Sequence, residues 1–498
     1  MSAATIPPPV LVWFRHDLRL QDNPALAAAL EQAARTGGGI LAVYILDEAG
    51  EGAWPYGGAS RWWLHHALAS LEASLKNLGS RLNIARGDSE TILHELIRST
   101  HANAVFWNRR YEPSIRARDE AVKKSLFAAG IEAKSFNGSL LFEPHTVANK
   151  QGKPFQVFTP FWKHCLTREI QRPQAMRSKS LPAPPVWPAS PTALPLSALD
   201  LLPSIRWDVD FGPQWEPGEA GASKRLDHFL KRALSEYSES RNIPGEDGTS
   251  MLSPWLHFGE LSPRQVWAAV EAQCHTEGLD LAEGSARTYL AEIGWREFGY
   301  HLTYHFPHTP EQPLRAEFAR FPWAKDPGGK KLRTWQKGLT GYPIVDAGMR
   351  QLWSTGWMHN RVRMVVASFL VKHLRLPWQQ GAAWFWDTLV DADLASNTLG
   401  WQWSAGCGAD AAPYFRIFAP VTQGQRFDTA GDYVRKYVPE LAQLPDKWIH
   451  APWEAPAGVL AAAGVTLGKT YPRPLVDHAA ARADALQAFA LLKEFRER

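Results

Sequence analysis

Three segments in the second half of the chain combine carboxylate, indole and guanidinium side chains. Glu292, Trp295 and Arg296 are spaced i, i+3 and i+4, so they share one face of a predicted helix. Such a face can stack a planar ligand on the indole and bond its polar edge with the charged groups. An exposed Glu–Arg pair beside a packed Trp would have the same spacing. The face is therefore a candidate binding site that needs support from elsewhere in the chain.

A second predicted helix places Asn360, Arg361 and Met364 on one face, with Arg363 on another. These residues could grip an anionic ligand, or they could form an ordinary solvated basic surface.

The third segment holds Asp391, Asp393 and Asn397, shortly before the aromatic run at 400–403. Two close carboxylates can bind a metal ion, but no His or Cys stands at ligand spacing. We therefore predict no metal here.

A run of small and hydroxyl-bearing residues at 249–253 is followed directly by Pro254. Hydroxyls and backbone N–H groups before a helix suit an anion such as a pyrophosphate. The same pattern also describes a plain helix start. Tyr237 and Arg241, four residues apart, share a helical face just upstream.

The composition is rich in aromatic residues and only mildly basic. The chain has 498 residues with 23 Trp, 22 Phe and 12 Tyr, and a formal net charge of +4. Bulky packing explains most single Trp residues, while ring stacking or electron relay is the functional alternative. The charge allows a nucleic-acid partner without demanding one. Three scattered cysteines and no apolar stretch of membrane-spanning length predict a cytoplasmic protein.

The elements that must position these residues differ between the two ends of the chain. Short apolar runs alternate with helical patterns early on, at 10–14, 40–46, 82–85, 104–107 and 131–136. This alternation predicts a doubly wound parallel sheet of the α/β class. No glycine-rich phosphate motif follows the first run.

A proline-rich stretch at 181–217 interrupts this pattern, and helical periodicity dominates from Ser223 onward. We therefore predict an α/β domain at 8–137, an interdomain linker at 138–222 and a mostly helical domain at 223–496.

Several segments together resemble the photolyase/cryptochrome family over nearly the whole chain. They occur in the family's order, at 12–20, 22–26, 341–350, 357–364 and 410–416. The chain is most similar to bacterial-type photolyases that act on cyclobutane pyrimidine dimers.

The resemblance implies FAD, held in a bent conformation within the helical domain. The positions that match the family's flavin site are Tyr237, Thr249, Ser250, Met251, Leu252, Ser253, Tyr289, Arg296, Arg363, Asp391, Ala392, Asp393 and Asn397. The hydroxyl run would then receive the flavin pyrophosphate, and Asp391 would pair with Arg363. Trp401, Trp378 and Trp323 match a relay of three indoles that carries an electron from the surface to the flavin.

The resemblance also implies a damaged-DNA substrate. Glu292, Trp295, Met364 and Trp403 match the pocket for a flipped-out dimer, with Glu292 stabilising the developing negative charge. The positions that match DNA contacts are Arg241, Asn360, Arg361 and Gln423.

Individual residues separate the functions that this family includes. Asn397 is typical of cyclobutane-dimer photolyases, and Met364 stands where (6-4)-type enzymes carry a histidine. We therefore predict a monomeric carbon–carbon lyase that uses light to repair pyrimidine dimers in UV-damaged DNA. The alternatives are a cryptochrome photoreceptor, a non-catalytic electron-transfer flavoprotein and (6-4) repair.

The family often binds a second, antenna chromophore in the α/β domain, and the segment 107–113 matches its neighbourhood. Ser114 and Ile115 depart from the Asn-Glu pair of some folate binders, and Arg110 departs from the acidic residue of deazaflavin binders. We expect methenyltetrahydrofolate rather than 8-hydroxy-deazaflavin, with an empty pocket as the alternative.

Overall fold

The computed structural model describes residues 7–189, 192–414 and 416–497. The start of the chain, residues 190 and 191 of the predicted linker, and Phe415 of the 410–416 motif lie outside this description. By its internal contacts the chain divides into two compact units. The first contains residues up to Pro154, Trp162–Lys231 and Ser250–His305. The second contains Phe155–Phe161, Arg232–Thr249 and the chain from Phe306 onward. The domain boundaries at 137 and 223 stay a prediction, and each unit is described by itself.

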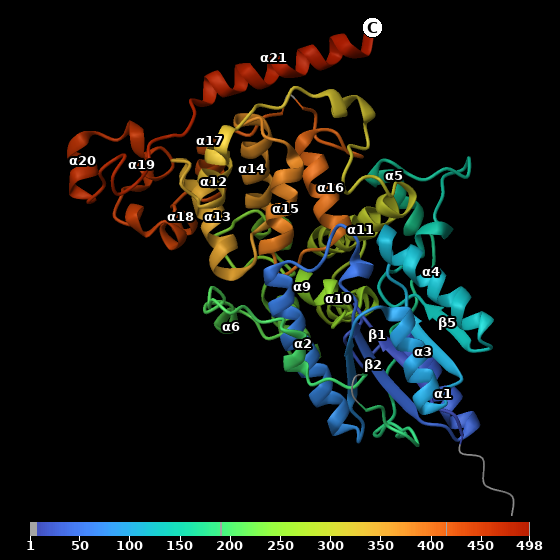
Figure 1. The fold of residues 1–498 in the computed structure, drawn as a ribbon. Coiled ribbons are helices and arrows are strands. Elements are labelled where there is room, and N and C mark those ends of the chain that lie inside the picture. Colours follow the sequence, from blue (N-terminus) through green and yellow to red (C-terminus); the bar gives the residue numbers. More distant parts are fainter. Residues whose placement is uncertain (1–6, 190–191, 415, 498) are drawn as a thin grey trace, which may run out of the picture. The chain divides into compact units, whose positions relative to one another are not determined.

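The first unit contains the predicted parallel sheet, which confirms the α/β part of the fold (Figure 1). Its strands are β1 (Val10–Phe14), β2 (Ile40–Leu46), β3 (Leu82–Arg86), β4 (Ala104–Asn108) and β5 (Glu132–Phe136). They are all parallel and lie in the order β3-β2-β1-β4-β5. Every residue of β1 and β2 is buried, as continuous apolar runs require in a sheet covered on both faces.

Helices cover both faces of this sheet. They are α1 (Pro24–Thr36), α2 (Gly58–Asn77), α3 (Ser89–Thr100) and α4 (Pro113–Ala128). Helix α1 begins where the Asn23 side chain accepts the Leu26 N–H at 3.1 Å, with Pro24 in the first turn. It packs against β1 and β4, while residues of α3 and α4 pack with Trp13 and Trp107 in one apolar cluster.

The remaining helices of the first unit lie in the stretches after the α/β part. They are α6 (Phe211–Gln214), α7 (Glu219–Arg232), α9 (Ser253–His257), α10 (Pro263–Glu277) and α11 (Gly284–His305). Helix α10 starts with a capping box, in which Ser262 and Gln265 bond each other's backbone N–H groups. The helix α5 (Phe158–Cys165) crosses from one unit to the other.

The second unit is helical, as predicted. Its main helices are α8 (Tyr237–Ser240), α12 (Lys330–Gln336), α13 (Pro343–Thr355), α14 (Asn360–Ser368), α15 (Trp378–Thr388), α16 (Leu394–Ala405), α17 (Pro420–Phe427), α18 (Asp432–Tyr437), α19 (Asp446–Ile449), α20 (Ala457–Ala462) and α21 (His478–Glu497). One π-helical turn, η6 (Phe369–His373), continues α14. Helices α13 to α16 surround a single apolar core. Among the described residues, none of the helices is both long and apolar enough to cross a membrane.

Candidate functional site

The predicted face of Glu292, Trp295 and Arg296 lies on α11, in the first unit. Glu292 and Trp295 are partly buried. The Arg296 guanidinium donates to the Ser139 carbonyl oxygen at 2.7 Å and to the Leu256 carbonyl oxygen at 3.3 Å. Arg296 therefore anchors α9 to α11, and with it the position of the hydroxyl run that leads into α9.

Residues 249–252 of that hydroxyl run form an irregular turn in front of α9, and Ser253 begins this helix. Met251 has a φ of 52°, an uncommon left-handed conformation for a residue with a side chain. Arg225 Nε donates to the Ser250 carbonyl oxygen at 2.8 Å and holds the turn from α7. Burial raises the pKa of Tyr289, whose hydroxyl interacts with Ser250. The first unit thus brings Tyr289 of α11 to the predicted pyrophosphate turn.

In the second unit, the expected pair of Arg363 and Asp391 is present. Arg363 Nη2 lies 2.8 Å from Asp391 Oδ2, and Arg363 Nε donates to the Met358 carbonyl oxygen at 2.7 Å. The other carboxylate oxygen, Asp391 Oδ1, is buried without a hydrogen-bond partner in the described part of the chain. A buried acceptor normally has a donor. This site therefore fits a ligand that brings N–H or O–H groups, and FAD is such a ligand.

Residues of α16 continue this site. The Asp393 side chain accepts the Ser396 N–H at 2.7 Å and caps α16, so Asp393 has a structural role at this helix start. Asn397 Nδ2 donates to the Ala382 carbonyl oxygen of α15 at 3.0 Å, which fixes the plane of the amide. Trp403, two turns further along α16, is partly buried. The buried Ala392 lies between the two aspartates.

The three tryptophans of the predicted relay all lie in the second unit. Trp401 and Trp378 are each 2% exposed, whereas Trp323 is only partly buried. The Trp401 ring lies directly against Gly381 of α15, because a Cβ at Gly381 would meet Trp401 Cη2 at 2.0 Å. Trp378 begins the same helix, one turn earlier. Close approach at Gly381 therefore places the Trp401 ring against the helix that carries Trp378.

The predicted DNA-contacting residues gather positive charge around Arg361. Its Nη2 donates to Asn242 Oδ1 at 2.5 Å, and its Nη1 lies 3.8 Å from Met364 Sδ. Burial and the like charges of Arg241 and Arg426 lower the pKa of Arg361. Like positive charges close together favour an anionic ligand.

Sequence reasoning missed Arg426 as a member of this cluster. It lies on α17, three residues after Gln423, and therefore on the same side of that helix. The i, i+3 spacing of Gln423 and Arg426 was the available signal. Asn360 is the exposed first residue of α14.

His359 has polar neighbours in the sequence, Asn360 and Arg361. It is buried, and its Nδ1 accepts the Arg361 N–H at the start of α14. Its Nε2 has no hydrogen-bond partner in the described residues. Burial, followed by the charges of Arg361, Arg363 and Arg241, lowers the pKa of His359 to about 3. His359 therefore stays neutral at physiological pH and adds no charge to the cluster.

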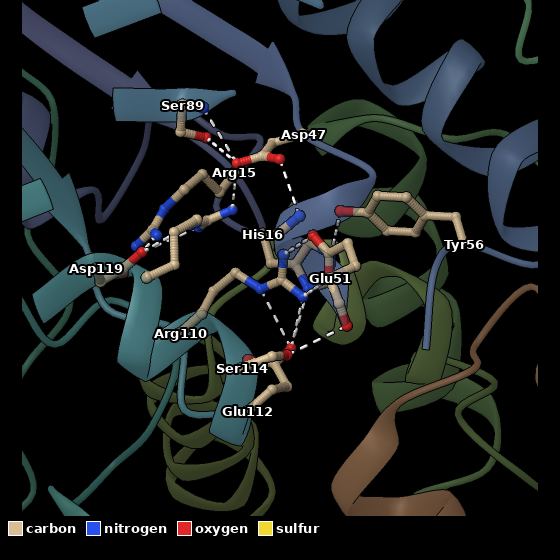
Figure 2. A network of polar contacts seen from close by, with 12 residues as sticks. Arg15, His16, Asp47, Glu51, Tyr56, Ser89, Arg110, Glu112, Ser114 and Asp119 are labelled. Carbon is tan, nitrogen blue, oxygen red and sulfur yellow. Dashed lines mark hydrogen bonds and ion pairs between the residues drawn. The ribbon is translucent and has the colours of Figure 1, made fainter. Parts of the chain in front are cut away.

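The predicted antenna neighbourhood lies at the carboxyl edge of the sheet, where charged and polar side chains bond one another (Figure 2). The Arg110 guanidinium lies 2.6 Å from Glu51 and 2.8 Å from Glu112, and all three side chains are at least nine-tenths buried. Burial lowers the pKa of Arg110, but Glu112 and Glu51 outweigh it and raise that pKa overall. His16 Nε2 and the Tyr56 hydroxyl are 2.9 Å apart beside this pair. Parallel sheets usually bind ligands at this edge, where strand order reverses between β1 and β4.

Comparisons with known proteins show which family the chain resembles. Residues 10–185 match the family model described as DNA photolyase, and residues 289–491 match the FAD binding domain of DNA photolyase. The chain is 51% identical over 489 residues to a deoxyribodipyrimidine photo-lyase of Agrobacterium fabrum, covering 98% of both chains. It is 41% identical over 490 residues to Cryptochrome-1 of Arabidopsis thaliana, covering 95% of this chain and 69% of that relative.

A solved structure gives the same result at the level of the fold. A bacterial class III photolyase from Agrobacterium tumefaciens superimposes with a TM-score of 0.93, at 49% identity and 99% coverage of both chains. The fold and the site therefore define a flavoprotein of the photolyase type. The chain belongs to the photolyase/cryptochrome family.

Proposed function

We propose that this protein is a deoxyribodipyrimidine photo-lyase, which uses light to split cyclobutane pyrimidine dimers in UV-damaged DNA. The observation that carries the proposal is the arginine cluster around Arg361, which lies within 3.8 Å of Met364. The cluster suits a phosphate backbone, and Met364 matches a dimer-pocket position. Support also comes from the relative of the same name at 51% identity.

FAD is the cofactor that we assign to this site. The residues that would hold it are Arg363, Asp391, Asn397, Tyr289 and the run at 250–253. The buried, unpaired Oδ1 of Asp391 supports a ligand with hydrogen-bond donors. When bound in its reduced form, FAD supplies one electron to the dimer on absorbing light and recovers it after splitting.

DNA binding follows from the positive charge in the second unit. Arg241, Arg361 and Arg426 would contact phosphates, with Asn360 and Gln423 beside them; such contacts position the strand without reading its sequence. A damaged, poorly stacked base pair costs less to flip out than a normal one. The cluster therefore supports binding to a lesion in any sequence context.

Once the dimer is flipped out, Trp295 and Trp403 would stack on it. Glu292 would bond the pyrimidine edge and hold a proton near the developing negative charge. Both indoles are partly buried, which leaves surface for a ring to cover.

We assign the electron relay to Trp401, Trp378 and Trp323, which would reduce the flavin before repair. The burial of the first two indoles and the partial exposure of the third support a path from the interior to the solvent.

For the antenna we propose methenyltetrahydrofolate rather than 8-hydroxy-deazaflavin. Arg110 replaces the acidic residue that deazaflavin binders carry, and ion pairs with Glu51 and Glu112 hold it in place. The mass and spectrum of any chromophore released on denaturation test this assignment. We further propose that the protein acts as a monomer in the cytoplasm.

The test combines binding and light-driven repair. We expect purified protein with reduced FAD to bind an oligonucleotide holding one cyclobutane thymine dimer and to restore thymine absorbance only under blue light. An oligonucleotide with one (6-4) product and an undamaged one serve as controls, and neither should change. Tight binding without recovery would favour a cryptochrome photoreceptor, for which the 41% identity to Cryptochrome-1 is the specific support. Bound flavin without lesion affinity would favour an electron-transfer flavoprotein.

A further inference from the structure

Arg375 bonds the chain on both sides of Trp323. The Ala324 N–H donates to the Arg375 carbonyl oxygen at 2.8 Å. Arg375 Nη1 donates to the Pro322 carbonyl oxygen at 3.2 Å. One residue therefore clamps the peptide groups directly before and after the outermost indole of the proposed relay.

The backbone of Arg375 is itself held in an unusual conformation. Its φ of 51° lies in the left-handed region, which a residue with a long side chain rarely adopts. The residue sits in the turn between η6 and α15, three positions before Trp378. Its neighbours Leu374 and Leu376 are fully buried, and the Leu376 N–H bonds the Leu370 carbonyl oxygen at 3.1 Å. Such a conformation persists only where the surrounding packing imposes it. Arg375 is therefore fixed to the start of the helix that carries Trp378.

The far side of the guanidinium is oriented from α21. Arg375 Nη2 lies 2.9 Å from Asp484 Oδ2, and the Arg375 side chain is 23% exposed. The Asp484 carboxylate is 57% exposed, so the pair adds little to stability. The ion pair instead orients the guanidinium: because Asp484 holds Nη2, Nη1 is directed at the Pro322 carbonyl oxygen.

We infer that Arg375 is a positioning residue of the electron relay, which holds Trp323 at a fixed place relative to Trp378. The inference rests on the proposed relay. In that relay Trp401 would give one electron to bound FAD under light, Trp378 would give one to Trp401, and Trp323 would give one to Trp378. A thiol in solution then gives one electron to Trp323 and releases a proton. Electron transfer between two indoles weakens steeply with their separation, so a loosened Trp323 makes the outer step slow.

The first test is light-driven flavin reduction in the full-length holoenzyme with dithiothreitol as the thiol. Arg375→Ala should lower the rate at least about fivefold, as misplacement of a reacting group does. Arg375→Lys should recover part of the loss, because an ammonium can still bond the Pro322 carbonyl oxygen. Arg320→Ala is the matched control, since Arg320 is an exposed arginine three residues before Trp323, and it should react at the parent rate.

Two further measurements distinguish a loss of Trp323 positioning from a general loss of structure or activity. Amide hydrogen exchange across 320–326 should rise in Arg375→Ala and stay unchanged in Arg320→Ala. After chemical reduction, which bypasses the relay, Arg375→Ala should split dimers at the parent rate. Unchanged exchange, or an equal loss of photoreduction and of splitting, would overturn the inference.

Trp323→Phe distinguishes failure of the inference from failure of the relay. If Trp323→Phe stops photoreduction and Arg375→Ala does not slow it, only the positioning role of Arg375 is wrong. If Trp323→Phe photoreduces at the parent rate, the assignment of Trp323 to the relay is wrong and the inference falls with it.

Discussion

The splitting of the dimer should depend strongly on Glu292. We expect Glu292→Ala to lower the quantum yield of dimer splitting by roughly tenfold or more, because a hydrogen bond to a charged group is lost in the reacting state. Affinity for the dimer should fall much less. Flash-induced repair and equilibrium binding measure the two effects separately. Glu283→Ala, an exposed carboxylate just before α11, is the control and should match the parent. Equal losses of affinity and yield would count against the assigned role.

Gly381 offers a test of indole placement with a matched control nearby. A Cβ at Gly381 would meet Trp401 Cη2 at 2.0 Å, so Gly381→Ala must displace a ring that is buried on all sides. We expect a large loss of light-driven flavin reduction, together with about 1–3 kcal/mol of destabilisation. Gly400→Ala is the control, because a Cβ there has nothing within 4 Å. Photoreduction at the parent rate in both variants would show that the Trp401 position is not critical.

Contacts in the candidate site were predictable where both residues belong to family motifs. They were not predictable where a contact joins segments that lie far apart in the sequence. The pairing of Arg363 with Asp391 followed from the resemblance, and the structure contains it. Arg426 and Arg375 were missed because their roles depend on how α17 and the turn before α15 fold against other segments. The burial of His359 was not predictable for the same reason, since polar neighbours in the sequence do not show what covers a side chain.

Among the helices, a buried carboxyl group in the turn between α9 and α10 makes the stability of the fold depend on pH. Glu260, in the turn between them, is 1% exposed, and its Oε2 accepts the Trp63 Nε1–H at 2.8 Å. Burial raises the pKa of Glu260 to about 8. The folded state therefore keeps a proton that the unfolded chain has lost between about pH 4.5 and 8. Stability contributed by this group is present below that window and is lost as pH rises through it.

Glu260→Gln should remove this dependence while keeping a side-chain oxygen for Trp63. Its advantage in Tm over the parent should grow from pH 5 to pH 8 and then level off, with a free-energy slope of at most about 1.4 kcal/mol per pH unit. Glu283→Gln, an exposed carboxylate, should follow the parent at every pH. A Tm difference between Glu260→Gln and the parent that stays constant across pH would contradict the assigned ionisation.

The elements themselves were largely predictable, for a physical reason. Strands buried on both faces must be continuous apolar runs, so β1 and β2 have the predicted bounds. The edge strand β5 contains Glu132 and Lys134, and the predicted run began one residue early there. The π-helical turn η6 could not be predicted from the sequence, because its residues are as apolar as those of the helix before it.

For DNA binding by the whole protein, the position of the positive charges is more important than the net charge of +4. We expect DNA binding to weaken with salt, since each neutralised phosphate releases counterions. Arg426→Gln should reduce the slope of log affinity against log salt by about one. The matched control is Arg98→Gln, an exposed arginine on α3, and it should leave the slope unchanged. An unchanged slope in Arg426→Gln would remove Arg426 from the DNA contact, and salt-independent binding by the parent would refute the phosphate assignment.

If light drives repair with no net redox change, one protein molecule should restore many dimers, so we would first measure turnover. Protein with fully reduced FAD is mixed, without any reductant, with a tenfold excess of an oligonucleotide holding one cyclobutane thymine dimer, and is illuminated with blue light. We expect that many dimers are restored per protein, that the flavin stays reduced, and that nothing is restored in the dark. Recovery of one dimer or fewer per protein, with the flavin oxidised in step, would contradict it.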